Sequence, residues 1–148
     1  MRIAKWWMAA IVAAAVAALA ALPAAAEAPE AGGCVGKARL RGPLWDTTNA
    51  ALEPGLDAAL DVIAETIREQ CRGKGIVIEG HAFEMPSAEL NMKLSELRVL
   101  LVRDELRKRG VPPHQLYPVP LGDTRPIAPK DDPDAVLENR RITFRAFD

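Results

Sequence analysis

The first 26 residues constrain the fold of this chain more than any other feature, because their pattern sets them apart from a folded domain. Of these residues 23 are apolar, two are basic and none is acidic. An unbroken apolar run covers residues 6–22, Pro23 interrupts it, and three alanines follow as a small-residue cleavage site. This three-part pattern is typical of a secretory signal peptide. We therefore predict a cleaved signal over residues 1–26 and export of the remainder.

Two alternatives to cleavage remain open at this point. Residues 6–26 are about long enough to cross the hydrocarbon core of a membrane as an uncleaved anchor. Cleavage is favoured because the run is rich in alanine, ends at a proline and leads directly into the small-residue site. A lipoprotein would be acylated at Cys34, but Ala31 stands where such a site usually has a large aliphatic residue.

The 122 residues that remain are enough for one domain, and their composition excludes some binding partners. They are 41% apolar, which is ordinary for a soluble domain with one core. They carry 17 basic and 20 acidic residues, a formal charge of −3. Binding to nucleic acid or to an anionic membrane surface requires clustered positive charge. We therefore expect no nucleic-acid partner.

The segment after the signal is expected to be a short linker, followed by the first elements of the domain. Residues 27–36 are small, acidic and rich in helix and strand breakers, and the domain is predicted over residues 37–148. Residues 37–41 alternate as a short first strand. Apolar residues then recur at helical spacing from Leu56 to Cys71.

A second helix is predicted from the cap at Ser87 to Lys108. Its last turn is basic and is followed by glycine and proline, as helix ends commonly are. Four leucines recur on one stripe, which predicts the buried face: Leu90, Leu94, Leu97 and Leu101.

Three further strands complete the expected sheet. Residues 76–78 are a β-branched run, and residues 142–146 alternate between apolar and polar side chains. Residues 116–121 look extended, but Pro118 and Pro120 lack N–H groups on the same side and place this strand at an edge. The order of elements predicts an α+β, two-layer sandwich with an approximately four-stranded mixed sheet and two main helices on one face.

The two cysteines are predicted to form a disulfide. Cys34 precedes the first strand and Cys71 ends the following helix. A strand running out and a helix running back cover similar distances, so these two ends meet. The alternative is a buried free thiol at Cys71 and a separate Cys34 in the preceding segment.

The sequence offers no recognisable catalytic or metal-binding motif. It has two histidines and no local pairing of cysteine with histidine, and the common nucleophile, phosphate-loop and dinucleotide motifs are absent from it. We therefore expect no enzyme activity, no metal and no cofactor.

One polar constellation lies on the second helix. Asn91, Ser95 and Arg98 recur at i, i+4 and i+7 beside the leucine stripe. An arginine at the edge of a buried face can present its planar fork to a carboxylate. From spacing alone, an ordinary solvated helix flank is the better explanation of these residues.

The surrounding motifs resemble the OmpA-like C-terminal domain family across residues 37–148. The matching pieces are Gly80-His81, Asn91, Leu94-Ser95, Arg98, Gly110-Val111, Gly122-Asp123 and Asn139-Arg140-Arg141. The resemblance implies non-covalent binding of peptidoglycan by gripping the free end of a diaminopimelate side chain in the stem peptide. In the family, the helix arginine holds the carboxylate of that end and an aspartate holds its ammonium group.

The sequence departs from the family pattern at a ligand-contacting position. Arg98 and Asn91 match the family's arginine and asparagine, but Phe83 stands at the aspartate position. Glu84 is the adjacent carboxylate and could replace the aspartate. Equally, Phe83 and Met85 could form an apolar lip for a different ligand or an envelope protein. Within the late motif, a structural role for Arg140 against the Asp123 loop is expected.

The leading hypothesis is an exported protein of a Gram-negative envelope that binds peptidoglycan through Arg98 and Asn91, with Ser95, Phe83 and Glu84 in the same site. Its expected location is the periplasm, in association with the outer membrane or cell wall, or at the inner membrane if the signal stays uncleaved. The alternative is a divergent OmpA-like scaffold that has lost peptidoglycan binding and serves as a protein-interaction module.

Overall fold

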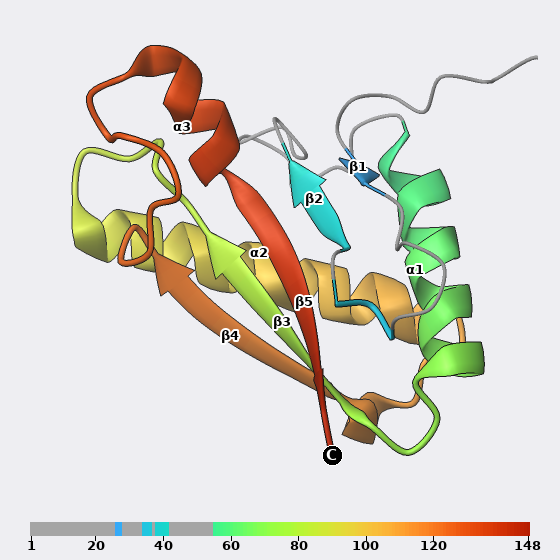
Figure 1. The fold of residues 1–148 in the computed structure, drawn as a ribbon. Helices are drawn as coiled ribbons and strands as arrows, with labels where there is room; N and C mark the ends of the chain where they lie inside the picture. The colour runs from blue at the N-terminus through green and yellow to red at the C-terminus, as the bar shows by residue number, and fades with distance from the viewer. Residues whose placement is uncertain (1–25, 28–33, 37, 42–54) are drawn as a thin grey trace, which may run out of the picture.

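The fold is known from a computed structural model that describes residues 26–27, 34–36, 38–41 and 55–148 (Figure 1). The signal peptide predicted over residues 1–26 therefore lies outside the described residues except at its last position. Within the described ranges, no helix combines the length and the apolar character needed to cross a bilayer.

A five-stranded mixed sheet forms one layer of the domain. Its strands are β1 (Ala26–Glu27), β2 (Arg39–Arg41), β3 (Gly75–His81), β4 (Leu116–Gly122) and β5 (Arg141–Phe147). The spatial order is β1-β2-β5-β3-β4, in which β3 and β4 are parallel and the other neighbours are antiparallel. The predicted mixed sheet is confirmed, and the two-residue β1 is added to it.

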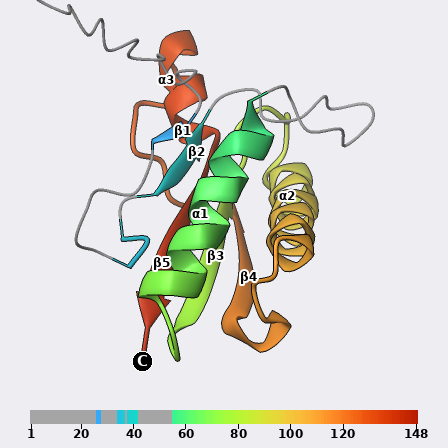
Figure 2. The same ribbon diagram turned by 90° about the vertical axis from the view of Figure 1, so that its right-hand side faces the viewer.

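Two long helices form the second layer. They are α1 (Leu56–Gln70) and α2 (Ala88–Lys108), with the shorter α3 (Pro133–Asn139) and the 3₁₀ turn η1 (Pro113–Gln115) in the connections. Figure 2 shows α1 and α2 beside the sheet, and α2 lies behind the sheet in the view of Figure 1. Both helices contribute to a single core with the inward residues of β3 and β5, so the predicted two-layer α+β sandwich is confirmed.

The strand patterns read from the sequence agree with the structure. Ile142 and Phe144 of β5 are 0% and 4% exposed, as their alternation predicts. In β4, Pro118 and Pro120 pair with residues of β3 only, and β4 forms the edge of the sheet. Prolines are tolerated there because no neighbouring strand needs their missing N–H groups.

The leucine stripe predicted as the buried face of α2 is confirmed only in part, because Leu101 packs against the core whereas two of its members are exposed. Leu97 is 66% exposed and Leu90 is 38% exposed. The face that turns toward the sheet carries Asn91, Ser95, Arg98, Val99, Val102 and Leu106. Polar residues therefore occupy its first half and apolar residues its second half.

Two glycines explain why α2 uses this face. A Cβ atom added to Gly80 would lie 2.4 Å from Val99 Cγ1 and 2.9 Å from the Ser95 carbonyl oxygen. A Cβ atom on Gly122, whose φ is +52°, would lie 3.1 Å from Met92 Cα. The helix backbone thus lies directly against the two strand ends. The space between this part of the helix and the strand ends is too narrow for leucine side chains, but it accommodates the face of the helix that carries the small Ser95 side chain.

Two described stretches before β2, residues 26–27 and 34–36, belong to the folded domain. Glu27 pairs with Arg39 in the sheet, and Val35 is 0% exposed within the core. The predicted disulfide between Cys34 and Cys71 is confirmed. It closes a loop with a sequence separation of 37 residues, and such a loop stabilises a fold by about 3 to 4 kcal/mol in the chain-entropy model. With its sulfur in the disulfide, Cys34 has no thiol left to acylate.

Candidate functional site

The predicted site residues gather where β3 ends and the N-terminal half of α2 crosses the sheet. Residues 82–87 form the loop that joins these two elements. The backbone N–H of Ala82 donates to the Gly122 carbonyl at 3.1 Å, which ties this loop to the end of β4. The start of β5 lies beside the same point, because His81 pairs with Arg141.

Asn91 fixes the shape of the loop before α2. Its Oδ1 accepts a hydrogen bond from the Met85 N–H at 3.0 Å, and its Nδ2 donates to the Met85 carbonyl at 3.2 Å. The helix begins one turn earlier, where Ser87 Oγ accepts from the Leu90 N–H at 3.2 Å. Both polar atoms of the Asn91 side-chain amide are thus engaged with the backbone of Met85.

Ser95 fastens the helix to the end of β4. Its Oγ accepts from the Gly122 N–H at 3.0 Å and donates to the Met92 carbonyl at 2.8 Å. The residue is 0% exposed. Its hydroxyl therefore satisfies a strand-end backbone group that would otherwise be buried without a partner.

The charged centre of the site consists of Glu84, Arg98 and Arg140, called here the Glu84 cluster. Glu84 Oε1 forms ion pairs with Arg98 Nη2 and, at 3.3 Å, with Arg140 Nε. The side chains of Glu84 and Arg98 are each 6% exposed, and that of Arg140 is 27% exposed. Two guanidinium groups thus converge on one carboxylate.

The environment of Glu84 keeps it ionised. Burial alone would raise its pKa, but the hydrogen bond and charge of Arg98, the Phe83 N–H and the charge of Arg140 together lower the pKa below its usual value. The Phe83 N–H donates to Glu84 Oε2 at 2.7 Å. Both carboxylate oxygens are consequently engaged inside the protein.

Phe83 faces a lysine from the loop after β4. Lys130 Nζ lies 5.6 Å from the centroid of the Phe83 ring and 3.7 Å from Asp123 Oδ2. The Lys130 side chain is 56% exposed and that of Asp123 is 23% exposed. The ammonium group of Lys130 therefore contacts both an aromatic ring and a carboxylate.

His81 lies beside the cluster as a buried neutral imidazole. It is 2% exposed, and its Nδ1 has no hydrogen-bond partner among the residues that the structure describes. Burial and the nearby charges of Arg141 and Arg125 lower its pKa from 6.5 to about 4.

The residues of the late motif, Asn139-Arg140-Arg141, contact both the site and the loop that follows β4. Asn139 Oδ1 accepts from the N–H groups of Ile127 and Ala128, and Arg141 donates to the Arg125 carbonyl at 3.1 Å. The expected contact of Arg140 with the Asp123 loop is wrong, since Arg140 pairs with Glu84. The sequence motif identified these residues as a group. The ion pair between Arg140 and Glu84 depends in addition on the register of β3 against β5, which the motif does not specify.

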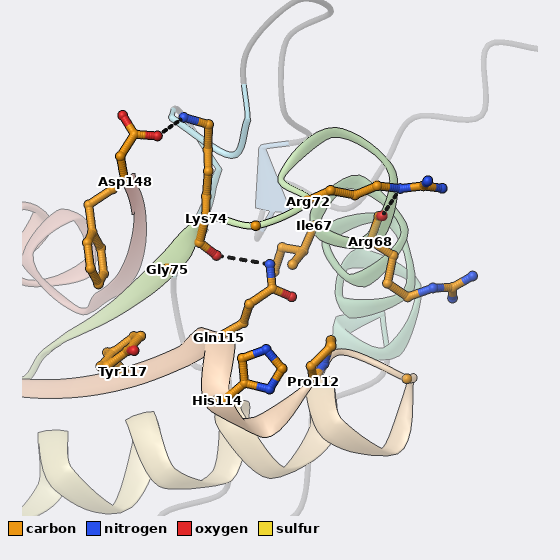
Figure 3. Close-up of a pocket in the computed structure, with 13 residues that line it drawn as sticks. Ile67, Arg68, Arg72, Lys74, Gly75, Pro112, His114, Gln115, Tyr117 and Asp148 are labelled. Carbon is orange, nitrogen blue, oxygen red and sulfur yellow. Dashed lines mark hydrogen bonds and ion pairs between the residues drawn. The ribbon is translucent and has the colours of Figure 1, made fainter.

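A pocket of about 480 Å³ lies at the opposite end of the sheet, where β3 begins (Figure 3). Gln115 in its wall donates to the carbonyls of Cys71 and Lys74 at 2.9 Å each. The guanidinium groups of Arg68 and Arg72 point away from Gln115 and Tyr117. Its charged groups do not converge on a common point, so this pocket is a weaker candidate. In the described part of the chain, no three metal-ligating side chains gather.

Comparisons with known proteins show the family of this chain. The model of the OmpA family matches residues 44–140. The chain is 37% identical over 101 residues to the peptidoglycan-associated lipoprotein of Pseudomonas putida, covering 68% of this chain and 60% of that protein. It thus spans about 60% of the length of that curated relative.

Two solved structures share the fold. The peptidoglycan-associated lipoprotein from Burkholderia pseudomallei has a TM-score of 0.62 and 26% identity, with coverage of 72% of this chain and 90% of that chain. The C-terminal domain of Helicobacter pylori MotB has a TM-score of 0.61 and 26% identity, with coverage of 66% and 76%.

Proposed function

This chain belongs to the OmpA family, and we propose that it is an exported, non-enzymatic envelope protein that binds peptidoglycan non-covalently at the Glu84 cluster. The names of its relatives support peptidoglycan as the ligand, since two of them are peptidoglycan-associated lipoproteins. We assign the signal to residues 1–26 and the binding domain to residues 37–148, with the periplasm as the location.

The observation that carries this proposal is the convergence of two guanidinium groups where β3 ends. Arg98 and Arg140 both reach the Glu84 carboxylate from separate elements of the fold. A guanidinium held in a partly desolvated position binds a carboxylate through charge-assisted hydrogen bonds. The free carboxylate at the end of a diaminopimelate stem peptide has this chemistry.

Glu84 takes a different role from the one that the sequence alone suggested. Both of its oxygens are engaged with Arg98, Arg140 and the Phe83 N–H. We therefore assign Glu84 as the internal counter-ion that holds the two arginines in place, rather than as the group that binds a ligand ammonium.

The proposal is tested by co-sedimentation of the mature protein with purified sacculi. Arg98→Ala should weaken binding roughly 10- to 150-fold, because a charge-assisted hydrogen bond contributes about 1.5 to 3 kcal/mol. Arg107→Ala is the matched control, since Arg107 is on the same helix with its side chain 48% exposed. The double change Glu84→Gln with Arg98→Met removes both members of this ion pair together and should weaken binding by a similar factor.

Two results would contradict the proposal. If wild-type protein stays in the supernatant, the chain does not bind peptidoglycan under these conditions. If Arg98→Ala sediments as well as wild type and Arg107→Ala, the binding site lies elsewhere on the molecule.

A second candidate function is a protein-interaction module that has lost the ligand site. The observation in its favour is a set of exposed apolar side chains at the start of α2 and in the loop before it, where Met85, Leu90 and Met92 are 37%, 38% and 37% exposed. This candidate predicts that Phe83→Asp creates sacculus binding that wild type lacks. Equal binding by wild type and Phe83→Asp would count against it.

A further inference from the structure

The arginines of the sheet lie on the face that turns away from the two long helices. Leu40, Ile142 and Phe144 belong to the core between the sheet and the helices, and successive residues of a strand point to opposite faces. The strand residues next to them therefore point outward, and four of these are arginines: Arg39, Arg41, Arg141 and Arg145. Figure 1 shows this face toward the viewer, with α2 behind it. It is called here the outer face of the sheet.

We propose that the outer face binds the surface of an anionic phospholipid bilayer. This inference goes beyond peptidoglycan binding and uses a different part of the molecule from the Glu84 cluster. The formal charge of −3 over residues 27–148 conceals such a face. The five strands together contain four arginines against two acids, Glu27 and Glu79.

Strand register brings the charges of the outer face together. Arg41 pairs directly with Arg141 across β2 and β5, and Arg41 also forms an ion pair with Glu138 at 3.1 Å. Arg141 itself is 7% exposed. Burial and the like charges of Arg39 and Arg41 lower its pKa, which the charge of Glu79 opposes in part. The guanidinium groups at this end of the face are thus close enough to repel one another, and a layer of phosphate groups above them would offset that repulsion.

Two further arginines of this face are exposed and weakly held. The side chains of Arg125 and Arg145 are 66% and 61% exposed, and they pair with Glu79 at 3.9 and 3.8 Å. The Arg125 carbonyl accepts a hydrogen bond from Arg141 at 3.1 Å, which ties Arg125 to this face. Exposed ion pairs of such length contribute little. Both guanidinium groups can therefore turn to a phosphate, whose oxygens suit their planar forks.

Aromatic side chains lie at the other end of the outer face. Tyr117 and Phe147 are 46% and 37% exposed, and their rings meet edge to face with centroids 5.2 Å apart. The Phe147 ring covers Gly75, where an added Cβ atom would lie 2.3 Å from it. Val77 pairs with Tyr117 on one side and with Arg145 on the other. The two rings therefore adjoin the exposed charges.

This combination favours a bilayer over a soluble polyanion or an acidic protein. Basic residues are attracted to anionic lipids, and aromatic rings are enriched at the depth of the lipid headgroups. A sheet presents both kinds of side chain on one broad surface, so that they can reach a flat membrane together. A soluble polyanion would use the arginines but would gain nothing from the rings.

The test is co-sedimentation of the mature protein, residues 27–148, with phospholipid vesicles. Wild type should bind vesicles that contain phosphatidylglycerol and phosphatidylcholine in equal amounts, and it should not bind vesicles of phosphatidylcholine alone. Binding should be lost at about 1 M salt, where the Debye length is about 3 Å. The double change Arg39→Gln with Arg145→Gln should weaken binding roughly 20- to 30-fold, because each arginine near an anionic surface contributes roughly fivefold.

Two further variants separate the charges of the outer face from charge in general and from its rings. Arg103→Gln with Arg107→Gln is the matched control, because it removes two partly exposed arginines from α2 in the other layer, and it should bind as wild type does. Phe147→Ser should weaken binding to anionic vesicles without changing its salt dependence, since it removes apolar contact and no charge. Urea denaturation of each variant should match wild type, which excludes loss of folding as the cause.

The proposal is overturned if wild type sediments with neither kind of vesicle or with both equally. It is also overturned if the two double variants lose binding to the same extent. Wild type that ignores vesicles but binds soluble poly-glutamate through Arg39 and Arg145 would assign the outer face to an acidic protein instead of a membrane. Because these assays contain no sacculi, a failure of peptidoglycan binding would not change their outcome.

Discussion

The two halves of α2 face the same sheet but bury different side chains. The N-terminal half buries Asn91, Ser95 and Arg98, whereas the C-terminal half buries Val102 and Leu106 at 0% exposure each. Each of the three polar side chains has a backbone or ionic partner, as buried polar groups require. One half of the helix is thus organised by specific polar contacts and the other by apolar packing.

We therefore expect the N-terminal half of α2 to contribute to ligand binding and the C-terminal half to contribute to the stability of the fold. Leu106 is eight residues from Arg98, about 12 Å along the helix axis. Changes in the C-terminal half should therefore affect folding without touching the ligand. Changes in the N-terminal half should affect binding, and those that unbalance its charges should affect folding as well.

In the polar half of α2, the largest loss of stability is expected from removing the internal counter-ion, Glu84. Glu84→Gln removes the carboxylate that Arg98 and Arg140 share, and it should lower the free energy of unfolding by about 3 to 5 kcal/mol. Urea denaturation measures the change. Glu89→Gln is the control, because the Glu89 side chain is 77% exposed and its loss should cost less than about 0.5 kcal/mol. Similar small effects in both variants would mean that the Glu84 cluster carries little stability.

The apolar half is tested by two leucines of the same helix. Leu106→Ala should lower the free energy of unfolding by about 3 kcal/mol, because it leaves a cavity in the core. Leu97→Ala, at a position 66% exposed, should change it by less than about 0.5 kcal/mol. Sacculus binding of both folded variants should equal that of wild type. An equal loss of stability at Leu97 would restore the leucine stripe as the buried face.

A smaller effect is expected from the histidine beside the polar half. The pKa of His81 is lowered to about 4 in the folded protein, so the unfolded chain binds more protons between pH 6.5 and pH 4. Stability should therefore fall by about 2 kcal/mol from pH 7 to pH 5 through this group alone. Urea denaturation at pH 7 and at pH 5 should show this loss of stability in wild type and in the control variant His114→Gln, which changes an exposed histidine. In His81→Gln, the difference in the free energy of unfolding between the two pH values should be smaller by about 2 kcal/mol. An unchanged difference in that variant would contradict a buried neutral imidazole at residue 81.

Much of the fold follows from local sequence patterns because those patterns report on nearby residues. The alternation in β5, the edge position of β4 and the cap at Ser87 each depend on a few neighbouring positions. The disulfide between Cys34 and Cys71 followed from the lengths of one strand and one helix.

The orientation of α2 did not follow from hydrophobic periodicity. The leucine spacing counts apolar side chains, but it ignores the shape of the surface that the helix meets. Gly80 and Gly122 set that shape by letting the helix backbone approach within contact distance. The small side of the helix fits there, and two of the leucines, Leu90 and Leu97, are left exposed.

The site was anticipated in part. Arg98, Asn91, Ser95 and Glu84 do come together, and their family motif was the signal that grouped them. The contact of Arg140 with Glu84 depends on strand register across 56 positions, which no local pattern encodes. The contacts of Lys130 with Phe83 and Asp123 similarly depend on two strand ends that meet only in the folded domain.

The most direct test of ligand binding at the polar half of α2 is an NMR titration of the mature protein with a soluble diaminopimelate-containing muropeptide. Backbone amide shifts should concentrate at residues 81–85, 91–98 and 122–123. The pocket at the other end of the sheet, around residues 72–75 and 114–115, should stay unchanged. Shifts confined to that pocket, with none near Arg98, would contradict the assignment of the site.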